Sequence, residues 1–106
     1  MANPIKNILA ELRRHLERVY GARLRSVWLY GSQARGDAQS ESDLDILVVL
    51  DGDVNPGEEI RRTGGFVSDL SLRNNVVLSC LFVSADRYAT EQSPILLNVR
   101  REGVAV

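Results

Sequence analysis

The sequence is poor in the residues that build cross-linked or metal-stapled domains. Its 106 residues include one cysteine, Cys80, and one histidine, His15. A lone cysteine cannot form an internal disulfide, and one cysteine with one histidine cannot supply the four ligands of a structural zinc site. These absences exclude a disulfide-rich scaffold and a zinc module, and the reducing cytoplasm is the expected location.

Long apolar runs and an excess of one charge are also missing. No uninterrupted apolar stretch approaches the ~20 residues that span a bilayer, and the first residues lack the basic-then-apolar order of a signal peptide. The 13 basic and 14 acidic residues give a net charge of -1. We therefore expect no membrane partner, and the chain carries no strong signal for nucleic-acid binding.

The length and composition are those of one folded domain. Hydrophobic residues make up 44% of the chain and charged residues 25%, which is ordinary for a globular protein and unlike a disordered one. A length of 106 residues leaves no room for a second domain of usual size, so residues 1–106 form a single domain. The turn-rich segment 51–57 is a loop within it.

Hydrophobic periodicity predicts an alternation of helices and strands. The spacing predicts helices over 5–20, 58–73, 85–91 and 94–101, a short helix over 33–36, and strands over 24–30, 44–50 and 76–83. This order predicts an α/β or α+β domain with a small mixed sheet flanked by helices. In the helix over 58–73, the inward residues are expected to be Ile60, Phe66, Val67 and Leu70. His15 lies off the apolar stripe of the first helix and is expected to be exposed.

Two carboxylates interrupt the otherwise apolar second strand. Side chains alternate between the faces of a strand, so Asp43 and Asp45 project to the same side with their α-carbons ~6.6 Å apart. Two like charges this close are unfavourable unless a cation lies between them. Oxygen ligands of this kind suit Mg²⁺ or Mn²⁺. The alternative interpretation of Ser42 to Asp45 as a helix capping box conflicts with the β-branched residues that follow.

The first strand runs into Gly31 and Ser32, which form the complementary half of the candidate site. A glycine lets the backbone approach a ligand closely, and a serine hydroxyl with the amides of a helix start donates to phosphate oxygens. Taken alone, this turn is also an ordinary strand-to-helix connection. Arg35 either contacts phosphate or pairs with Asp37, and the sequence leaves these two alternatives open.

Together these segments resemble a known family. Gly31-Ser32-x-Ala34-Arg35-Gly36 followed by Ser42-Asp43-x-Asp45 is similar to the signature of the minimal nucleotidyltransferases of the DNA polymerase β superfamily, and in particular of its small antitoxin-type members. The resemblance implies the nucleotidyltransferase fold, Mg²⁺ (or Mn²⁺) held by Asp43 and Asp45, and a nucleoside triphosphate, by preference ATP, held at Gly31, Ser32 and Arg35. It further implies transfer of a nucleoside monophosphate to a hydroxyl group with loss of pyrophosphate.

One departure from the family pattern concerns a third carboxylate. Family members that catalyse transfer usually carry an acid on the next core strand, where this chain has Ser79. Asp69 before that strand is expected to be a solvated helix residue, and Asp86 after it a helix-start residue. Cys80 on the same strand is expected to pack in the core.

Two hypotheses about function follow. In the first, the chain is an enzyme that attaches AMP to a protein partner, which the resemblance implies to be an all-helical HEPN toxin neutralised by the chain. In the second, the chain is a catalytically weak or inactive binding module that neutralises its partner by forming a complex. Transfer to a small molecule is a third, less favoured alternative. The sequence leaves the activity, the nucleotide base and self-association into a homo-oligomer open.

Overall fold

A four-stranded mixed sheet forms the centre of the fold, with the strand order β3-β2-β1-β4. The computed structural model describes residues 3–31, 34 and 43–106. The strands are β1 (Leu24–Tyr30), β2 (Leu44–Leu50), β3 (Leu78–Ser84) and the two-residue β4 (Val104–Ala105). β1 is antiparallel to β2 and β4, whereas β2 and β3 are parallel. The predicted mixed sheet is therefore confirmed, and β4 is an addition that the sequence pattern did not indicate.

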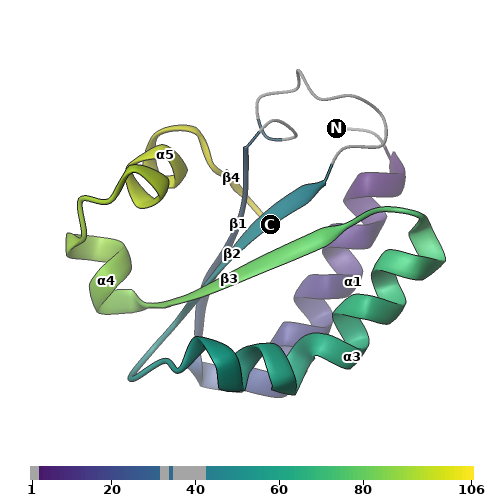
Figure 1. The fold of residues 1–106 in the computed structure, drawn as a ribbon, viewed down its shortest axis with the longest axis horizontal. Coiled ribbons are helices and arrows are strands. Elements are labelled where there is room, and N and C mark those ends of the chain that lie inside the picture. The colour runs from purple at the N-terminus through teal and green to yellow at the C-terminus, as the bar shows by residue number, and fades with distance from the viewer. Residues whose placement is uncertain (1–2, 32–33, 35–42) are drawn as a thin grey trace.

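Helices cover both faces of the sheet (Figure 1). α1 (Asn3–Tyr20) and α3 (Pro56–Asn74) lie on one face, and the short α4 (Ala85–Thr90) and α5 (Pro94–Glu102) lie on the other. A 3₁₀ turn, η1 (Gly21–Arg23), joins α1 to β1. The short helix expected over 33–36 lies outside the described residues, apart from Ala34. Among the described residues, no helix is both long and apolar enough to cross a bilayer.

β2 contributes side chains to two hydrophobic cores, one on each face of the sheet, because it is an inner strand. Leu44, Ile46 and Val48 point into the core under α1 and α3, while Leu47 and Val49 point into the smaller core under α4 and α5. A strand that is buried on both faces has a nearly continuous apolar sequence. The exception is Asp45, which is only half-buried and lies on the α4/α5 side. Because side chains alternate between the faces of β2, the Asp45 carboxylate lies on the same side as Leu47 and Val49, next to the smaller core.

α3 begins and ends at residues suited to those positions. The Asn55 side chain accepts a hydrogen bond from the Glu58 N–H at 3.2 Å, and Pro56 occupies the first turn. A cap of this kind contributes about 1 kcal/mol. The helix ends at Asn75, which has a left-handed φ of 54°.

The buried face of α3 differs from the predicted one at Ile60, whereas Phe66, Val67 and Leu70 face the core as predicted. Ile60, expected inside, is 54% exposed, and the neighbouring Glu59 is buried instead. The Tyr20 hydroxyl donates a 2.7 Å hydrogen bond to Glu59 Oε1, which satisfies the buried carboxylate. Leu70 is buried as predicted, and Phe66 packs against the same core.

The prediction that His15 is exposed was also wrong. It is half-buried, and its ring stacks on Phe66 with centroids 3.9 Å apart and an interplanar angle of 4°. The contact joins α1 to α3. Burial, with a smaller contribution from the Arg18 charge, lowers the pKa of His15 below its usual value.

Candidate active site

The turn after β1 brings the backbone directly against a carboxylate of β2. Tyr30 is the cross-strand partner of Asp45, and Gly31 follows it with a φ of +79°. A β-carbon built at Gly31 would lie 2.7 Å from Asp45 Oδ2, which is closer than real side chains approach. Position 31 therefore requires glycine for two reasons: its backbone has a left-handed φ, and the Asp45 carboxylate occupies the space of a β-carbon.

Asp43 and Asp45 act on each other electrostatically, as their spacing predicts. Asp43 is exposed immediately before β2, and Asp45 is half-buried within it. Burial, followed by repulsion from the Asp43 charge, raises the pKa of the Asp45 carboxyl. The protein alone therefore disfavours the ionised form of Asp45, and a cation bound beside this carboxylate would stabilise that form.

The third strand presents a hydroxyl where a third carboxylate was sought. Ser79 is the register partner of Asp45 in the parallel β2–β3 pair, so the two side chains project to the same face. Ser79 is exposed at the sheet edge. Within the described ranges, no group of three His, Cys, Asp or Glu side chains is placed to hold a metal ion. The predicted alignment of Ser79 with the carboxylates is confirmed as a position in the sheet.

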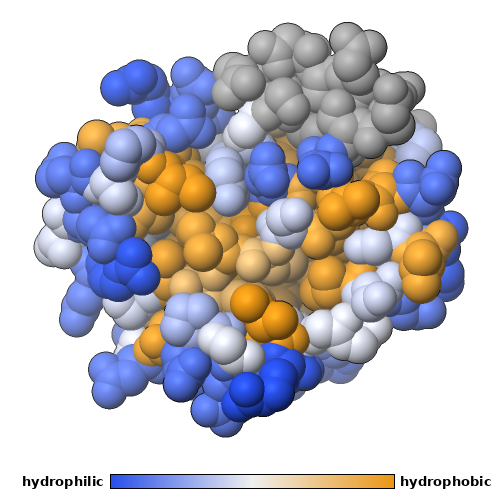
Figure 2. Space-filling model, viewed as in Figure 1, coloured by the Kyte–Doolittle hydropathy of each residue, from blue (hydrophilic) through white to orange (hydrophobic). Residues whose placement is uncertain are grey.

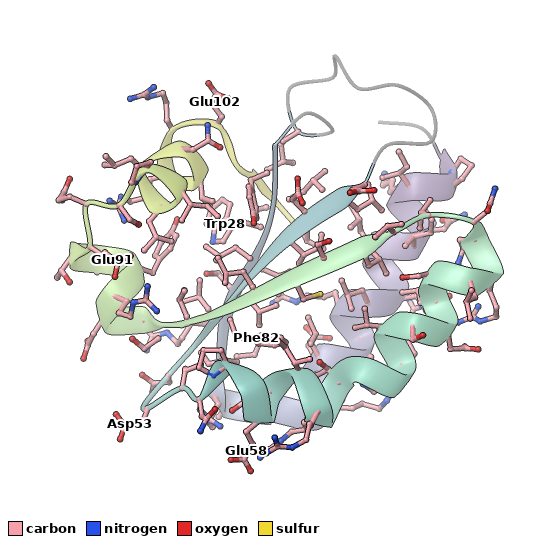
Figure 3. All side chains as sticks on the ribbon, viewed as in Figure 1. Trp28, Asp53, Glu58, Phe82, Glu91 and Glu102 are labelled. Carbon is pink, nitrogen blue, oxygen red and sulfur yellow. The ribbon has the colours of Figure 1, made fainter. Side chains whose placement is uncertain are left out.

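The face that carries the carboxylates continues into an aromatic region under α4 and α5. Trp28 lies on this side of the sheet and stacks on Tyr88 with centroids 6.1 Å apart, whereas Phe82 lies on the opposite side (Figure 3). Tyr30 lies between Trp28 and the turn. Its pKa is raised chiefly by burial and then by the charge of Asp45. The carboxylates thus lie between the apolar core under α4 and α5 and the strand ends that carry the Gly31 turn.

The remaining candidate residues are placed as follows. Ser32 and Arg35 lie outside the described residues, so their proposed contacts with phosphate stay predictions. Asp69 is an exposed residue of α3 that forms a 2.8 Å ion pair with Arg73, and Asp86 is in the first turn of α4. Cys80 packs against the core of α1 and α3, and burial raises the pKa of its thiol to about 12, which excludes a ready nucleophile.

Comparison with known proteins identifies the family. The sequence profile described as "Nucleotidyltransferase domain" matches residues 5–83, which cover α1 through most of β3. This chain belongs to the nucleotidyltransferase domain family. The Gly31 turn and the carboxylates of β2 lie inside the matched region, and the α4, α5 and β4 segments follow it.

Individual relatives agree with this assignment. A Methanocaldococcus jannaschii protein named "Putative protein adenylyltransferase MJ0604" is 50% identical over 38 residues, which are 36% of this chain and 38% of that protein. The match thus spans well under two thirds of the relative's length. A crystal structure of a toxin–antitoxin with AMP-PNP has a TM-score of 0.61 at 18% identity, covering 98% of this chain and 72% of that chain. A mutant of the MntA-HpeT toxin–antitoxin has a TM-score of 0.58 at 14% identity, covering 90% and 69%. The two structures show a shared nucleotidyltransferase fold.

The described residues fit a divalent cation of the kind this family uses. Asp43 and Asp45 offer oxygen donors on one face, and such donors suit Mg²⁺ or Mn²⁺. Burial, and then repulsion from Asp43, raise the pKa of Asp45, and a cation bound beside it would offset both effects. The Gly31 turn leaves the Asp45 carboxylate uncovered by any side chain of its own. Two ligands fit the ion, and the neutral Ser79 does not add a third.

Proposed function

We propose that this chain binds a metal complex of a nucleoside triphosphate, by preference ATP, and transfers the nucleoside monophosphate to a hydroxyl group of a protein partner. The proposal rests on the position of the Asp45 carboxylate. Its Oδ2 lies against Gly31, and the like charge of Asp43 acts on it. This arrangement supports a site in which the Gly31 turn admits phosphate and the two carboxylates hold a metal ion. Membership of the nucleotidyltransferase family and the neighbour crystallised with AMP-PNP support the same assignment.

The reaction is a displacement at the α-phosphorus. The acceptor oxygen forms a bond to that phosphorus, the bond to the bridging oxygen of the β-phosphate breaks, and pyrophosphate departs while the hydroxyl proton passes to solvent. A bound divalent ion would align the phosphates and absorb developing negative charge. Asp43 and Asp45 would hold that ion, and the Gly31 turn would admit the triphosphate close to the backbone.

The protein partner is proposed to be an all-helical HEPN-type toxin. Two structural neighbours are toxin–antitoxin assemblies, which supports a protein partner for this chain as well. In the proposal, this partner chain presents the acceptor hydroxyl to the site. AMP transfer to that partner would neutralise it.

A second candidate function rests on Ser79. A carboxylate at this position would face Asp45 and assist both the metal and the acceptor, and a hydroxyl does neither well. Assistance by a general base is typically worth 10²–10⁴-fold in rate. The chain would then neutralise its partner by forming a complex, with slow transfer or none.

One experiment tests the proposal and separates the two candidates. The chain is copurified with the product of its neighbouring gene and incubated with Mg²⁺ and ATP labelled in the α-phosphate. Label on the partner that Asp45→Asn abolishes supports the transferase, while a stable unlabelled complex supports the binding module. Absence of both label and complex would contradict the proposed function.

A further inference from the structure

A groove lies between α1 and β4, and its lining includes no residue of the candidate active site. It has a volume of about 600 Å³, which is within the usual range for ligand-binding clefts. Three of its lining side chains are cationic, namely Lys6, Arg13 and Arg14, and the others are apolar. No acidic side chain of the described chain lines it. The groove therefore combines an apolar floor with positive charge.

Lys6 and Arg14 are the cations of the groove that are available to a ligand. Arg13 is already engaged, because it donates to the Val106 carbonyl at 2.9 Å and pairs with Glu17 at 3.2 Å. Lys6 and Arg14 are exposed, and neither forms an ion pair with a carboxylate within the described ranges. Their positions on α1 put them roughly 12 Å apart along the helix axis. A ligand with two negative charges at about that spacing would be held at both ends of the groove.

β4 offers backbone hydrogen-bonding groups to the same groove. The Val106 N–H donates to the Val27 carbonyl at 2.9 Å, and the register pairs Ala105 with Trp28. In antiparallel strands, the residues next to a hydrogen-bonded pair direct their N–H and C=O groups away from the partner strand. Ala105 is exposed and lines the groove, so both of its backbone groups are directed to the outer edge of the sheet. Among the described strands, only β1 pairs with β4.

The combination of charge and apolar surface distinguishes this groove from the other apolar surface of the molecule. Figure 2 shows a face on which hydrophobic side chains gather across the middle, within more polar margins. Apolar area of that kind can cover many partners, because it carries no charge that would select one. The groove on α1 has both, and its charge has one sign. Its ligand is therefore defined by electrostatic complementarity.

We propose that this groove binds an acidic segment of another protein, which lies alongside β4 in an extended conformation and adds a strand to the sheet. The backbone of the segment pairs with the N–H and C=O of Ala105, as in other cases of strand addition. Two carboxylates of the segment contact Lys6 and Arg14, and an apolar side chain between them covers Leu9. Residues four positions apart on one face of a strand are separated by ~13 Å, which is close to the spacing of the two cations.

A protein segment fits these observations better than a nucleic acid does. Two free cations would neutralise too few phosphates for substantial affinity, and the apolar floor has no role toward a phosphate backbone. The net charge of -1 also gives no general attraction for a polyanion. The outward backbone groups of Ala105 are suited to another polypeptide.

The position of the groove leaves the candidate active site uncovered. α1 lies on one face of the sheet, and Asp45 projects to the other face, under α4 and α5. A segment bound beside α1 would tether its protein to the chain and raise the local concentration of the rest of that protein. The proposal does not depend on whether the chain transfers AMP.

The first test measures fluorescence anisotropy of a labelled, capped seven-residue peptide. The peptide has glutamate at the second and sixth positions, valine at the fourth, and serine or threonine elsewhere. The intact chain is titrated to about 500 µM, because a short peptide with few contacts binds weakly. Saturable binding is expected, and glutamine in place of both glutamates should weaken it about fivefold or more, the typical value of two exposed ion pairs.

The matched variants each remove two positive charges. Lys6→Gln with Arg14→Gln should weaken binding of the glutamate peptide about fivefold or more. Arg61→Gln with Arg101→Gln changes two exposed residues outside the groove and should bind the peptide as the wild type does. No saturable binding, equal binding of the two peptides, or an equal loss in both double variants would overturn the proposal.

The second test asks whether the peptide pairs with the β4 backbone. Ala105→Pro removes an N–H that the β1–β4 pairing does not use, and edge strands accept proline. Circular dichroism should therefore show an unchanged fold, and peptide binding should be lost. Ala105→Val keeps the N–H and should bind as the wild type does. In the wild type, the peptide should also slow hydrogen exchange of the Ala105 amide.

Two outcomes would contradict this mode of binding. Full peptide affinity in a folded Ala105→Pro variant, with unchanged exchange at Ala105 in the wild type, would exclude strand addition. A single-stranded oligonucleotide that binds more tightly than the peptide, and is lost with Lys6→Gln and Arg14→Gln, would assign the groove to nucleic acid instead.

Discussion

The carboxylate of Asp45 lies where a side chain at Gly31 would have to begin, since a β-carbon there would approach Asp45 Oδ2 to 2.7 Å. This contact joins the turn after β1 to the charged end of β2. The glycine is therefore required by the carboxylate as well as by any phosphate that approaches the turn. In the proposed site, metal binding and nucleotide binding would be coupled through the α-carbon of Gly31.

The first prediction compares two glycines with the same backbone conformation. Gly31 has a φ of +79° and Gly52 a φ of +82°, but a β-carbon at Gly52 would meet nothing within 4 Å. Gly52→Ala should lower the free energy of unfolding by about 1 kcal/mol through backbone strain alone. Gly31→Ala should cost more and should also weaken Mg²⁺ binding, as followed by urea unfolding and by titration calorimetry. Equal losses in both variants, with unchanged Mg²⁺ affinity, would contradict the role of the contact.

The second prediction concerns the carboxylate pair. Mg²⁺ with ATP should raise the melting temperature of the wild-type chain, because a ligand that binds only the native state stabilises it by mass action. The double variant Asp43→Asn with Asp45→Asn should lose this increment. Without metal it should be at least as stable as the wild type, since the mutual repulsion is gone. An undiminished Mg²⁺–ATP shift in the double variant would place the site elsewhere.

The third prediction uses the position of Ser79 beside Asp45 in the β2–β3 register. Ser79→Asp should increase transfer of labelled AMP to the partner, by as much as 10²–10⁴-fold if the new carboxylate acts as a general base. Ser79→Asn is the control of equal shape without the charge, and it should leave transfer unchanged. Assays are run at saturating Mg²⁺ to offset repulsion among the three acids. Strong transfer by the wild type, with no gain from Ser79→Asp, would show that two carboxylates suffice.

The fourth prediction is a pH dependence that comes from His15. Its pKa in the folded chain is lowered by burial and by Arg18, so the unfolded chain binds the proton more tightly. Stability should therefore be full above the unfolded pKa of 6.5 and should fall as the pH drops below it. His15→Leu keeps an apolar contact with Phe66 and should remove this part of the loss between pH 7.5 and 5.5 in urea unfolding. An identical pH profile in the variant would exclude His15 as the source.

The fifth prediction concerns the buried carboxylate of α3. Tyr20→Phe removes the hydroxyl that donates to Glu59 Oε1 at 2.7 Å and leaves this buried oxygen with Arg62 Nε, at 3.6 Å, as its remaining partner. The expected loss is about 1–3 kcal/mol in the free energy of unfolding. Adding Glu59→Gln to Tyr20→Phe should recover part of this loss, because the neutral amide is less costly to bury. No difference between Tyr20→Phe and the wild type would show that water satisfies Glu59 equally well.

The strand segments and their succession along the chain were largely predictable because their signal is local, whereas the order of the strands in the sheet was not predicted. Leu24 to Tyr30 and Leu44 to Leu50 are apolar and β-branched runs bounded by turns, and both form strands at those residues. The two-residue period of a strand predicts that Asp43 and Asp45 converge, and the Asp43 charge contributes, after burial, to the raised pKa of Asp45.

The features that the sequence did not predict depend on contacts between elements that are distant along the chain. Glu59 replaces Ile60 on the inner face of α3 because the Tyr20 hydroxyl, 39 residues earlier, satisfies its carboxylate. His15 leaves the solvent because Phe66 offers a flat partner across the α1–α3 contact. β4 has only two residues, too few for a pattern, and is defined by its pairing with Trp28 and Leu29. The Asp45 approach to Gly31 likewise depends on a cross-strand register that no local spacing reveals.

The division of β2 between core and site bears on how such a chain can evolve. Leu44, Ile46 and Val48 support the fold from one side of this strand, while Asp45 and its neighbour Ser79 face the other side and belong to neither apolar core. Acids there can be lost by mutation without selection against misfolding. Under the proposed function, a lineage can therefore change from modifying its partner to only binding it. A single codon change can restore the acid, while the surface that the partner recognises is retained.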